Sequence, residues 1–241
     1  MLAVFLVFCR VGTASMLLPG FGIARVPVLF RVLLGFVLSA ATYSFIQTAM
    51  KFPVPDADIP RVVANELLVG FYFGFLCALF AHAVRLSANF IMTLVGLAGI
   101  PGQPIDDLEP NPPFVMFMSM TFTALVYATD LHLVSYRALI ETYDVFPLGT
   151  APQLDTIINM LGDTLHDTSL MALQASSPFI LHGLGINFAL GLVGKLTPQL
   201  QVYFALMGVS TLVALLALYV IGSPLLSFMV SSYASWLETA L

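Results

Sequence analysis

Five polar or charged side chains lie inside or beside long apolar stretches of this sequence: Arg10, Glu66, Arg85, Asn187 and Lys195. Burying an ionisable group in lipid costs several kcal/mol unless a partner neutralises it, so such groups occur where they bind or position something. We therefore predict that these residues make intramembrane polar contacts or subunit contacts. For Glu66 and Arg85 a second interpretation stands beside this one, in which each side chain reaches from a helix end to the headgroup region.

Lys195 differs from the others because of the residues that follow it. In the segment GKLTPQLQ, Pro198 interrupts one apolar run just before the next begins, and Gln199 follows directly. A proline leaves backbone carbonyls without their helical partners, and an ammonium group can bind them. We predict a polar contact point at these three residues, with an ordinary loop lysine as the alternative.

The sequence shows no motif that is typical of catalysis or metal binding. The four histidines share no ligand spacing, and the sequence contains neither a nucleophile elbow nor a phosphate-binding glycine loop. Asp130 and His132 are two residues apart, which on a helix directs them to different faces. We expect no enzymatic activity, no cofactor and no metal site.

The composition indicates that the elements positioning these side chains lie in lipid. Of the 241 residues, 59% are hydrophobic and 9% are charged, whereas soluble domains carry roughly 25% charged residues. The net charge is −5 and the eight Lys and Arg residues are scattered singly, so no nucleic-acid surface is expected. Cys9 and Cys77 each lie in an apolar run, which favours buried free thiols over a disulfide. We predict an all-α integral membrane protein with a single domain over residues 1–241.

Six windows of the sequence are long enough to cross a bilayer, since a hydrocarbon core about 30 Å thick requires about 20 apolar helical residues. The predicted spans are Leu2–Gly20, Val28–Met50, Glu66–Gly96, Phe114–Tyr136, Leu170–Gly194 and Leu200–Ile221. Two amphipathic helices are expected in addition. The first begins at Leu154 and places its polar face at an interface. The second is the tail Ser223–Leu241, whose Trp236 suits a headgroup boundary, although the tail equally suits a partner-facing helix.

Two pairs of small residues predict close packing of helices. Gly70 and Gly74 form one small-residue face, and Gly185 with Ala189 forms another. Glycine is common in membrane helices, so chance spacing is the alternative.

The stretch from Gly96 to Pro113 is rich in glycine and proline and cannot form a continuous helix. Irregular backbone at membrane depth must be buried in protein or line an aqueous path. At that depth the loop would be a pore element, whereas in water it would be a plain connector, which its acidic residues suit. The candidate gating residues are Gly96, Leu97, Gly99, Pro101, Gly102, Asp106, Asp107 and Pro110.

Four blocks of the sequence resemble the FliR family of flagellar biosynthetic proteins and follow one another in the family's order. They are Arg10–Ala40, Glu66–Ala98, Asp130–Gly149 and the most specific block, NFALGLVGKLTPQLQVYFALMGV at Asn187–Val209. Lys195 stands where the family usually has arginine. The residues 207–209 replace a usual Gly-Phe-Pro, and the loop 99–113 lacks the family's contiguous Asp-Pro.

The resemblance implies a subunit of the flagellar type III protein-export gate in the bacterial inner membrane, at the flagellar basal body. It implies co-assembly with FliP and FliQ subunits into a helical ring of hairpins, with FlhA and FlhB around it and unfolded flagellar proteins as export substrates. The loop Gly96–Pro113 would then plug the pore at rest.

Two alternatives to this function stay open. One is an SctT-type subunit of a virulence injectisome, which shares the family fold. The other is a small-solute transporter, but a transporter should show paired broken helices with polar residues at the midplane. In this sequence Asn187, Lys195 and Gln199 occur in one half only.

Overall fold

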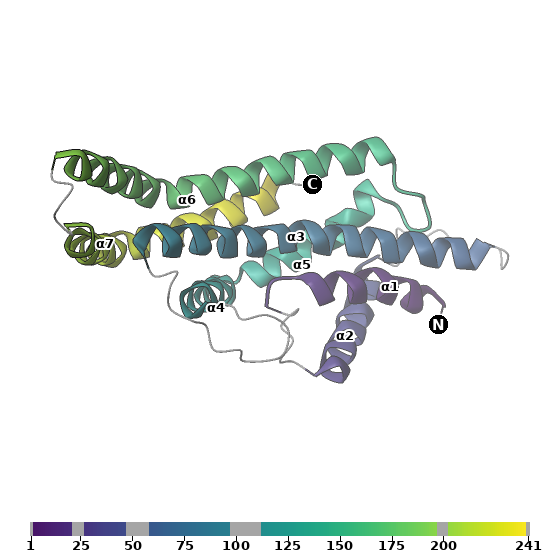
Figure 1. The fold of residues 1–241 in the computed structure, drawn as a ribbon. Helices are drawn as coiled ribbons and strands as arrows, with labels where there is room; N and C mark the ends of the chain where they lie inside the picture. Colours follow the sequence, from purple (N-terminus) through teal and green to yellow (C-terminus); the bar gives the residue numbers. More distant parts are fainter. Residues whose placement is uncertain (1, 21–26, 47–57, 97–111, 197–201, 240–241) are drawn as a thin grey trace. The chain divides into compact units, whose positions relative to one another are not determined.

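The structure, a computed structural model, describes residues 2–20, 27–46, 58–96, 112–196 and 202–239. These residues form seven α-helices and no β-strand (Figure 1). The helices are α1 (Leu2–Leu17), α2 (Val28–Ile46), α3 (Ile59–Val95), α4 (Pro113–Ala128), α5 (Leu131–Val145), α6 (Leu154–Leu196) and α7 (Val202–Thr239). The predicted all-α class is confirmed.

Three helical segments within the described residues are long and apolar enough to cross a membrane by themselves: Ile59–Val95, Leu154–Lys195 and Gly208–Thr239. Helices α4 and α5 meet the same criterion together, although they are bent by 75° at the break between them. Helices α1 and α2 are shorter apolar helices. The described residues therefore provide three or four candidate spans, and the six predicted windows match them only approximately.

The prediction of one continuous helix over Phe114–Tyr136 is wrong. Asp130 adopts the left-handed conformation, with φ 57° and ψ 14°, which is uncommon for residues other than glycine. This residue redirects the chain between the end of α4 and the start of α5. Neither proline nor glycine marks the position, so the sequence contains no ordinary signal for the break.

The two predicted amphipathic helices are also not separate elements. Helix α6 extends over 43 residues from Leu154 and passes through Pro178. Helix α7 extends over 38 residues and passes through Pro224. In each case the predicted amphipathic stretch is therefore part of a longer helix that also contains an apolar segment.

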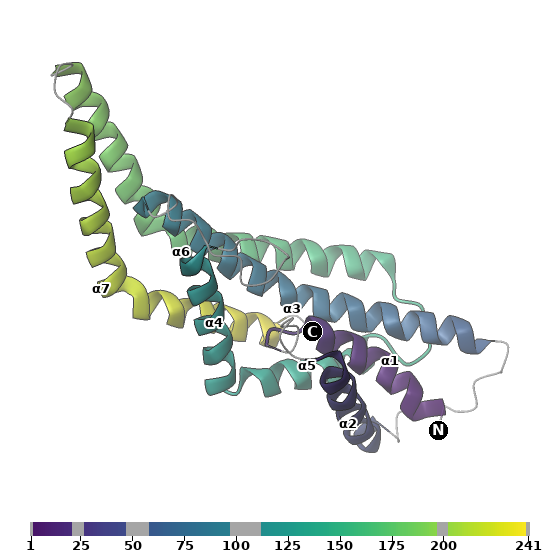
Figure 2. The same cartoon turned by 60° about the horizontal axis from the view of Figure 1, so that its bottom comes forward.

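The chain divides into two compact units. Unit 1 comprises residues 1–81, 123–167 and 233–241, and unit 2 comprises residues 82–122 and 168–232. In unit 1, α1 and α2 pack on each other (Figure 2). A Cβ on Gly35 would lie 3.4 Å from the Cα of Gly12, so the two helix backbones come close at these glycines.

Aromatic side chains join the remaining helices of unit 1. Phe80 of α3 packs against Tyr233 and Trp236 of α7, with ring centroids 5.4 and 4.9 Å apart. The Tyr233 hydroxyl lies 2.8 Å from the hydroxyl of Ser135 on α5. The Tyr136 hydroxyl donates to the carbonyl oxygen of Leu38 on α2 at 2.8 Å. These contacts bring α2, α3, α5 and α7 around one core.

Unit 2 is built from the later part of α3, the first part of α4 and most of α6 and α7. Its small core includes Ile91, Phe122, Phe179 and Met229, each at most 1% exposed. Helix α6 directs large apolar side chains outward, and the exposed fractions of Leu181 and Phe188 are 70% and 71%. An apolar surface of this kind requires lipid or protein around it.

Candidate functional site

Helix α1 crosses α3 at the two glycines that the sequence predicts to pack helices. A Cβ on Gly70 would lie 2.9 Å from both the Cα and the carbonyl carbon of Arg10. A Cβ on Gly74 would lie 2.8 Å from the carbonyl oxygen of Ala14. The two helix backbones therefore touch at this crossing, which only small residues allow.

A fully buried ion pair lies at the same crossing. Glu66 precedes Gly70 by one turn on the same face of α3. Arg10 donates from Nε to Oε2 of Glu66 at 2.7 Å and from Nη2 to Oε1 at 3.1 Å. Both residues are 0% exposed. The interpretation that Glu66 reaches the headgroup region is therefore wrong, because its charge is neutralised inside unit 1.

The end of α5 supplies further partners for the guanidinium of Arg10. Nη2 donates to the carbonyl oxygen of Phe146 at 2.9 Å, and Nη1 donates to the hydroxyl of Thr142 at 3.3 Å. The guanidinium carbon lies 3.8 Å above the centre of the Tyr143 ring, which is cation–π geometry. The charge is therefore surrounded by acceptors and by a π face in place of water.

The carboxylate of Glu66 has a further partner in the turn that follows α5. Its Oε1 accepts a hydrogen bond from the backbone N–H of Gly149 at 2.9 Å. The neighbouring Asn65 donates from Nδ2 to the carbonyl oxygen of Gly149 at 3.3 Å. Consecutive residues of α3 therefore bind both backbone polar groups of one residue in the turn.

This arrangement can hold helices together but offers no reactive group. The guanidinium of Arg10 can only donate hydrogen bonds, and the carboxylate of Glu66 already accepts three, two from Arg10 and one from Gly149. Within the described parts of the chain, no group of three or more His, Cys, Asp and Glu side chains could hold a metal ion. Cys9 and Cys77 are free and buried, as the sequence predicts.

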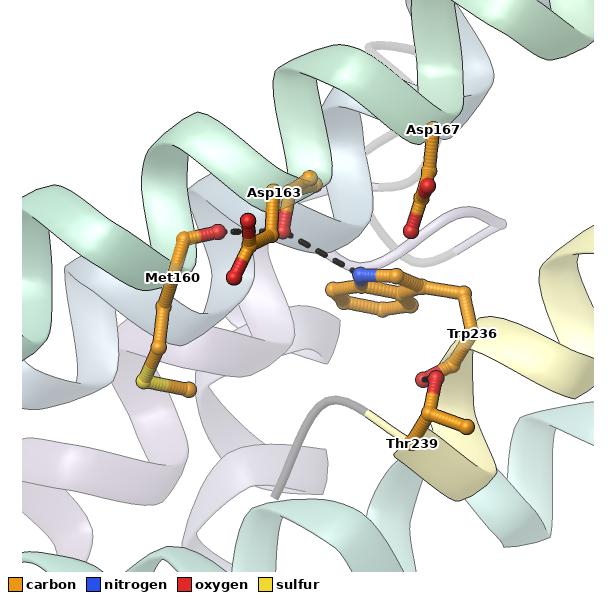
Figure 3. Close-up of a pocket in the computed structure, with 6 residues that line it drawn as sticks. Met160, Asp163, Asp167, Trp236 and Thr239 are labelled. Carbon is orange, nitrogen blue, oxygen red and sulfur yellow. Dashed lines mark hydrogen bonds between the residues drawn. The ribbon is translucent and has the colours of Figure 1, made fainter.

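A second feature of unit 1 is a cavity between α6 and the end of α7 (Figure 3). Its volume is about 300 Å³. The residues that line it are Met160, Asp163, Thr164, Asp167, Trp236 and Thr239. Trp236 donates from its indole N–H to the Thr164 hydroxyl at 3.1 Å and is only 4% exposed. The indole N–H is therefore satisfied within the protein and does not face lipid headgroups or water, whereas the depth of this residue in the membrane stays a prediction.

The remaining described polar residues that the sequence singles out belong to unit 2. Arg85 is exposed on α3 and donates to the Ser119 hydroxyl at 3.5 Å. Asn187 is exposed on α6 and donates to the carbonyl oxygen of Gly183, one turn earlier, at 2.9 Å. Lys195 is exposed near the end of α6.

The second predicted small-residue face has no packing partner among the described residues. Gly185 and Ala189 are both exposed, and a Cβ on Gly185 would meet no atom within 4 Å. Its role in helix packing stays a prediction, and this surface is open to a neighbour.

The predicted gating residues, apart from Gly96, and the predicted contact residues Pro198 and Gln199 fall outside the described residues. Gly96 is described and has a positive φ of 84°. The residues that lie outside are Leu97, Gly99, Pro101, Gly102, Asp106, Asp107, Pro110, Pro198 and Gln199. Their predicted roles stay predictions.

Three residues of the buried cluster carry no mark in the sequence that points to this site. Thr142 and Tyr143 sit within a helix of ordinary composition, and Gly149 reads only as a turn residue after Pro147. Their side chains or amides reach Arg10 and Glu66 because of how the helices pack, which a single sequence does not reveal.

The fold and the site together define an integral membrane protein of packed α-helices that neutralises its buried charges internally. The profile of the family described as bacterial export proteins, family 1, matches residues 1–236, and the chain belongs to this family.

Three relatives of this chain carry the name of a flagellar protein. The chain is 27% identical over 212 residues to the flagellar biosynthetic protein FliR of Caulobacter vibrioides, covering 87% of this chain and 84% of the relative. It is 25% identical over 208 residues to FliR of Bacillus subtilis, covering 83% and 78%. It is 22% identical over 237 residues to FliR of Aquifex aeolicus, covering 97% and 90%. The resemblance seen in the sequence is confirmed.

Proposed function

We propose that this chain is a membrane subunit of the bacterial flagellar protein-export gate and works there without catalysing a reaction. The observation that carries the proposal is the family profile, which extends over nearly the whole chain. Relatives from separate bacteria bear the name flagellar biosynthetic protein FliR and align over most of their length.

The proposal includes a setting in the inner membrane and assembly with FliP and FliQ subunits, with FlhA and FlhB nearby. The outward apolar surface of unit 2 supports such an assembly. Of the residues in the most apolar window of Leu154–Lys195, only 11% are buried within the chain, whereas 50% are buried in the corresponding window of Ile59–Val95. Asn187 lies on that outward surface, and a polar amide is better accommodated against a protein neighbour than against lipid tails.

We keep the plug of the export pore as the proposed role of the loop Gly96–Pro113. The support is its position between two apolar helices and its glycine and proline content, which prevents a continuous helix.

The flagellar role is tested by deleting the gene in its own bacterium. The expected result is loss of swimming and loss of flagellin and hook protein from the culture medium, both restored by the gene on a plasmid. A variant with Arg137→Ala should restore them as well, because that side chain is 80% exposed and, among the described residues, forms its ion pair with Glu141 of the same helix. Normal export in the deletion strain would contradict the flagellar role and favour the injectisome or transporter alternatives.

Assembly is tested separately by expressing the tagged chain together with FliP and FliQ of the same bacterium. Native mass spectrometry of the purified material should show this chain bound to both partners. Recovery of the chain alone, under conditions in which FliP and FliQ accumulate in the membrane, would contradict the assembly.

A further inference from the structure

The two charges of the buried ion pair contact the same short piece of backbone, the turn that joins α5 to α6. Arg10 binds the carbonyl oxygen of Phe146 at 2.9 Å, and Glu66 binds the N–H of Gly149 at 2.9 Å. Phe146 is the residue that ends α5, and α6 begins at Leu154. The ion pair therefore binds the first residues of the connection between α5 and α6, which lies far from both Arg10 and Glu66 in sequence.

The polarity of each contact matches the backbone group that it meets. The last carbonyls of a helix have no partner within the helix and carry partial negative charge, so they suit a cation. The guanidinium of Arg10 meets such a carbonyl and also the Thr142 hydroxyl in the last turn of α5. The N–H group of Gly149 suits the carboxylate of Glu66 for the converse reason.

Gly149 combines a backbone conformation that favours glycine with close contacts to α3. Its φ of 80° is a left-handed conformation that glycine adopts at little cost. Asn65 binds its carbonyl oxygen at 3.3 Å, and a Cβ at this position would lie 3.4 Å from a methyl group of Val62. The turn therefore packs on one face of α3, over residues 62–66.

Burial makes these contacts interdependent. Arg10 and Glu66 are both 0% exposed, so water is not available to either charge when a partner is missing. The guanidinium needs the carboxylate and the α5 carbonyl at once, and the carboxylate needs the guanidinium and the Gly149 amide. The cluster is satisfied only when α1, α3 and the turn are all in place.

We infer that Arg10 and Glu66 act as a latch that fixes the Phe146–Gly149 turn on α3 and thereby sets where α6 begins. A plain ion pair that only neutralises charge would tie α1 to α3 and leave the turn to be held by other contacts. The latch concerns the folding of unit 1 and holds whichever subunits surround the chain.

The test compares two double variants that differ in one hydrogen-bond acceptor. Both carry Arg10→Met, and the second substitution is Glu66→Gln in one and Glu66→Met in the other. Neither variant leaves a buried charge, and Gln and Met have similar lengths. Only Gln keeps an oxygen that can accept the N–H of Gly149.

The readout is hydrogen exchange at single amides in the full chain, purified in detergent with the subunits that accompany it. The Gly149 amide should exchange about tenfold faster or more in the variant with Met than in the variant with Gln, because only Met leaves the amide without a partner. The amide of Ile157, in the first turn of α6, should accelerate in the same variant.

Amides of Leu76 and Phe80 in the middle of α3 serve as the internal control and should keep their rates in both variants. Equal exchange of Gly149 in the two double variants would overturn the latch, whether both are slow or both are fast. If the double variants do not accumulate, the single substitutions Glu66→Gln and Glu66→Met are compared in the same way. Exchange of Gly149 that is about tenfold or more faster in Glu66→Met than in Glu66→Gln supports the latch, and equal exchange in the two overturns it.

Discussion

The backbone of Arg10 occupies the space that any side chain at position 70 would need. A Cβ on Gly70 would lie 2.9 Å from two backbone atoms of Arg10, and the carbonyl oxygen would be nearer still. The glycine that lets α1 approach α3 and the arginine that pairs with Glu66 thus belong to one contact. Close approach of the helices is what places the guanidinium beside the carboxylate.

Gly70→Ala should destabilise the protein by about 1–3 kcal/mol, because backbone atoms of α1 cannot rotate away from the added methyl group as a side chain could. Thermal unfolding in detergent measures the change. Gly185→Ala is the matched control, since a Cβ there meets no atom within 4 Å. Alanine within a helix should leave stability unchanged or raise it by up to about 1 kcal/mol. Equal effects of the two substitutions would contradict the crossing.

Removing one member of the ion pair should cost more than removing both. Arg10→Met leaves the Glu66 carboxylate buried and unpaired, with an expected loss of about 3–5 kcal/mol. Adding Glu66→Gln should recover part of that loss, because no charge then remains in the core. A double variant less stable than either single variant would argue against a buried pair.

The surface pair Arg137–Glu141 provides the control for that cycle. Its side chains are 80% and 46% exposed, so solvent screens their attraction. Arg137→Met should change the unfolding free energy by less than about 1 kcal/mol.

Tyr143→Phe should be neutral or slightly stabilising. The Tyr143 hydroxyl is buried with no hydrogen-bond partner among the described residues, while its ring lies under the Arg10 guanidinium at 3.8 Å. Phenylalanine removes the unsatisfied hydroxyl and keeps the π face. Tyr143→Leu removes the π face as well and should cost about 1–2 kcal/mol more than Tyr143→Phe, measured by the same unfolding assay. The reverse order would show that the hydroxyl is needed.

Trp236 makes the burial at the end of α7 directly measurable, because it is the single tryptophan of the chain. At 4% exposure, with its N–H bonded to Thr164, the indole should emit at short wavelength and resist quenching by acrylamide. Thr164→Val removes the acceptor and should cost about 1 kcal/mol of stability with little change in quenching. Strong quenching in the natural protein would place the indole in contact with solvent and contradict this burial.

The sequence by itself determined that the protein lies in lipid and that it is built from α-helices. The scarcity of charge and the long apolar windows require helices in lipid, because each helix satisfies its own backbone hydrogen bonds. The spacing of Gly70 and Gly74 predicted a packing face, since residues four apart share one side of a helix. The four sequence blocks also placed the chain in its family. These are local properties, so a single sequence is enough to find them.

Only the tertiary structure decided which partners these residues have. Arg10 and Glu66 each stood out in the sequence, but nothing local shows that residues 56 positions apart will meet. The burial of Trp236 depends on Phe80 of α3 and Thr164 of α6. Each of these features comes from contacts distant in sequence, and their free energy exists only once the helices have packed together.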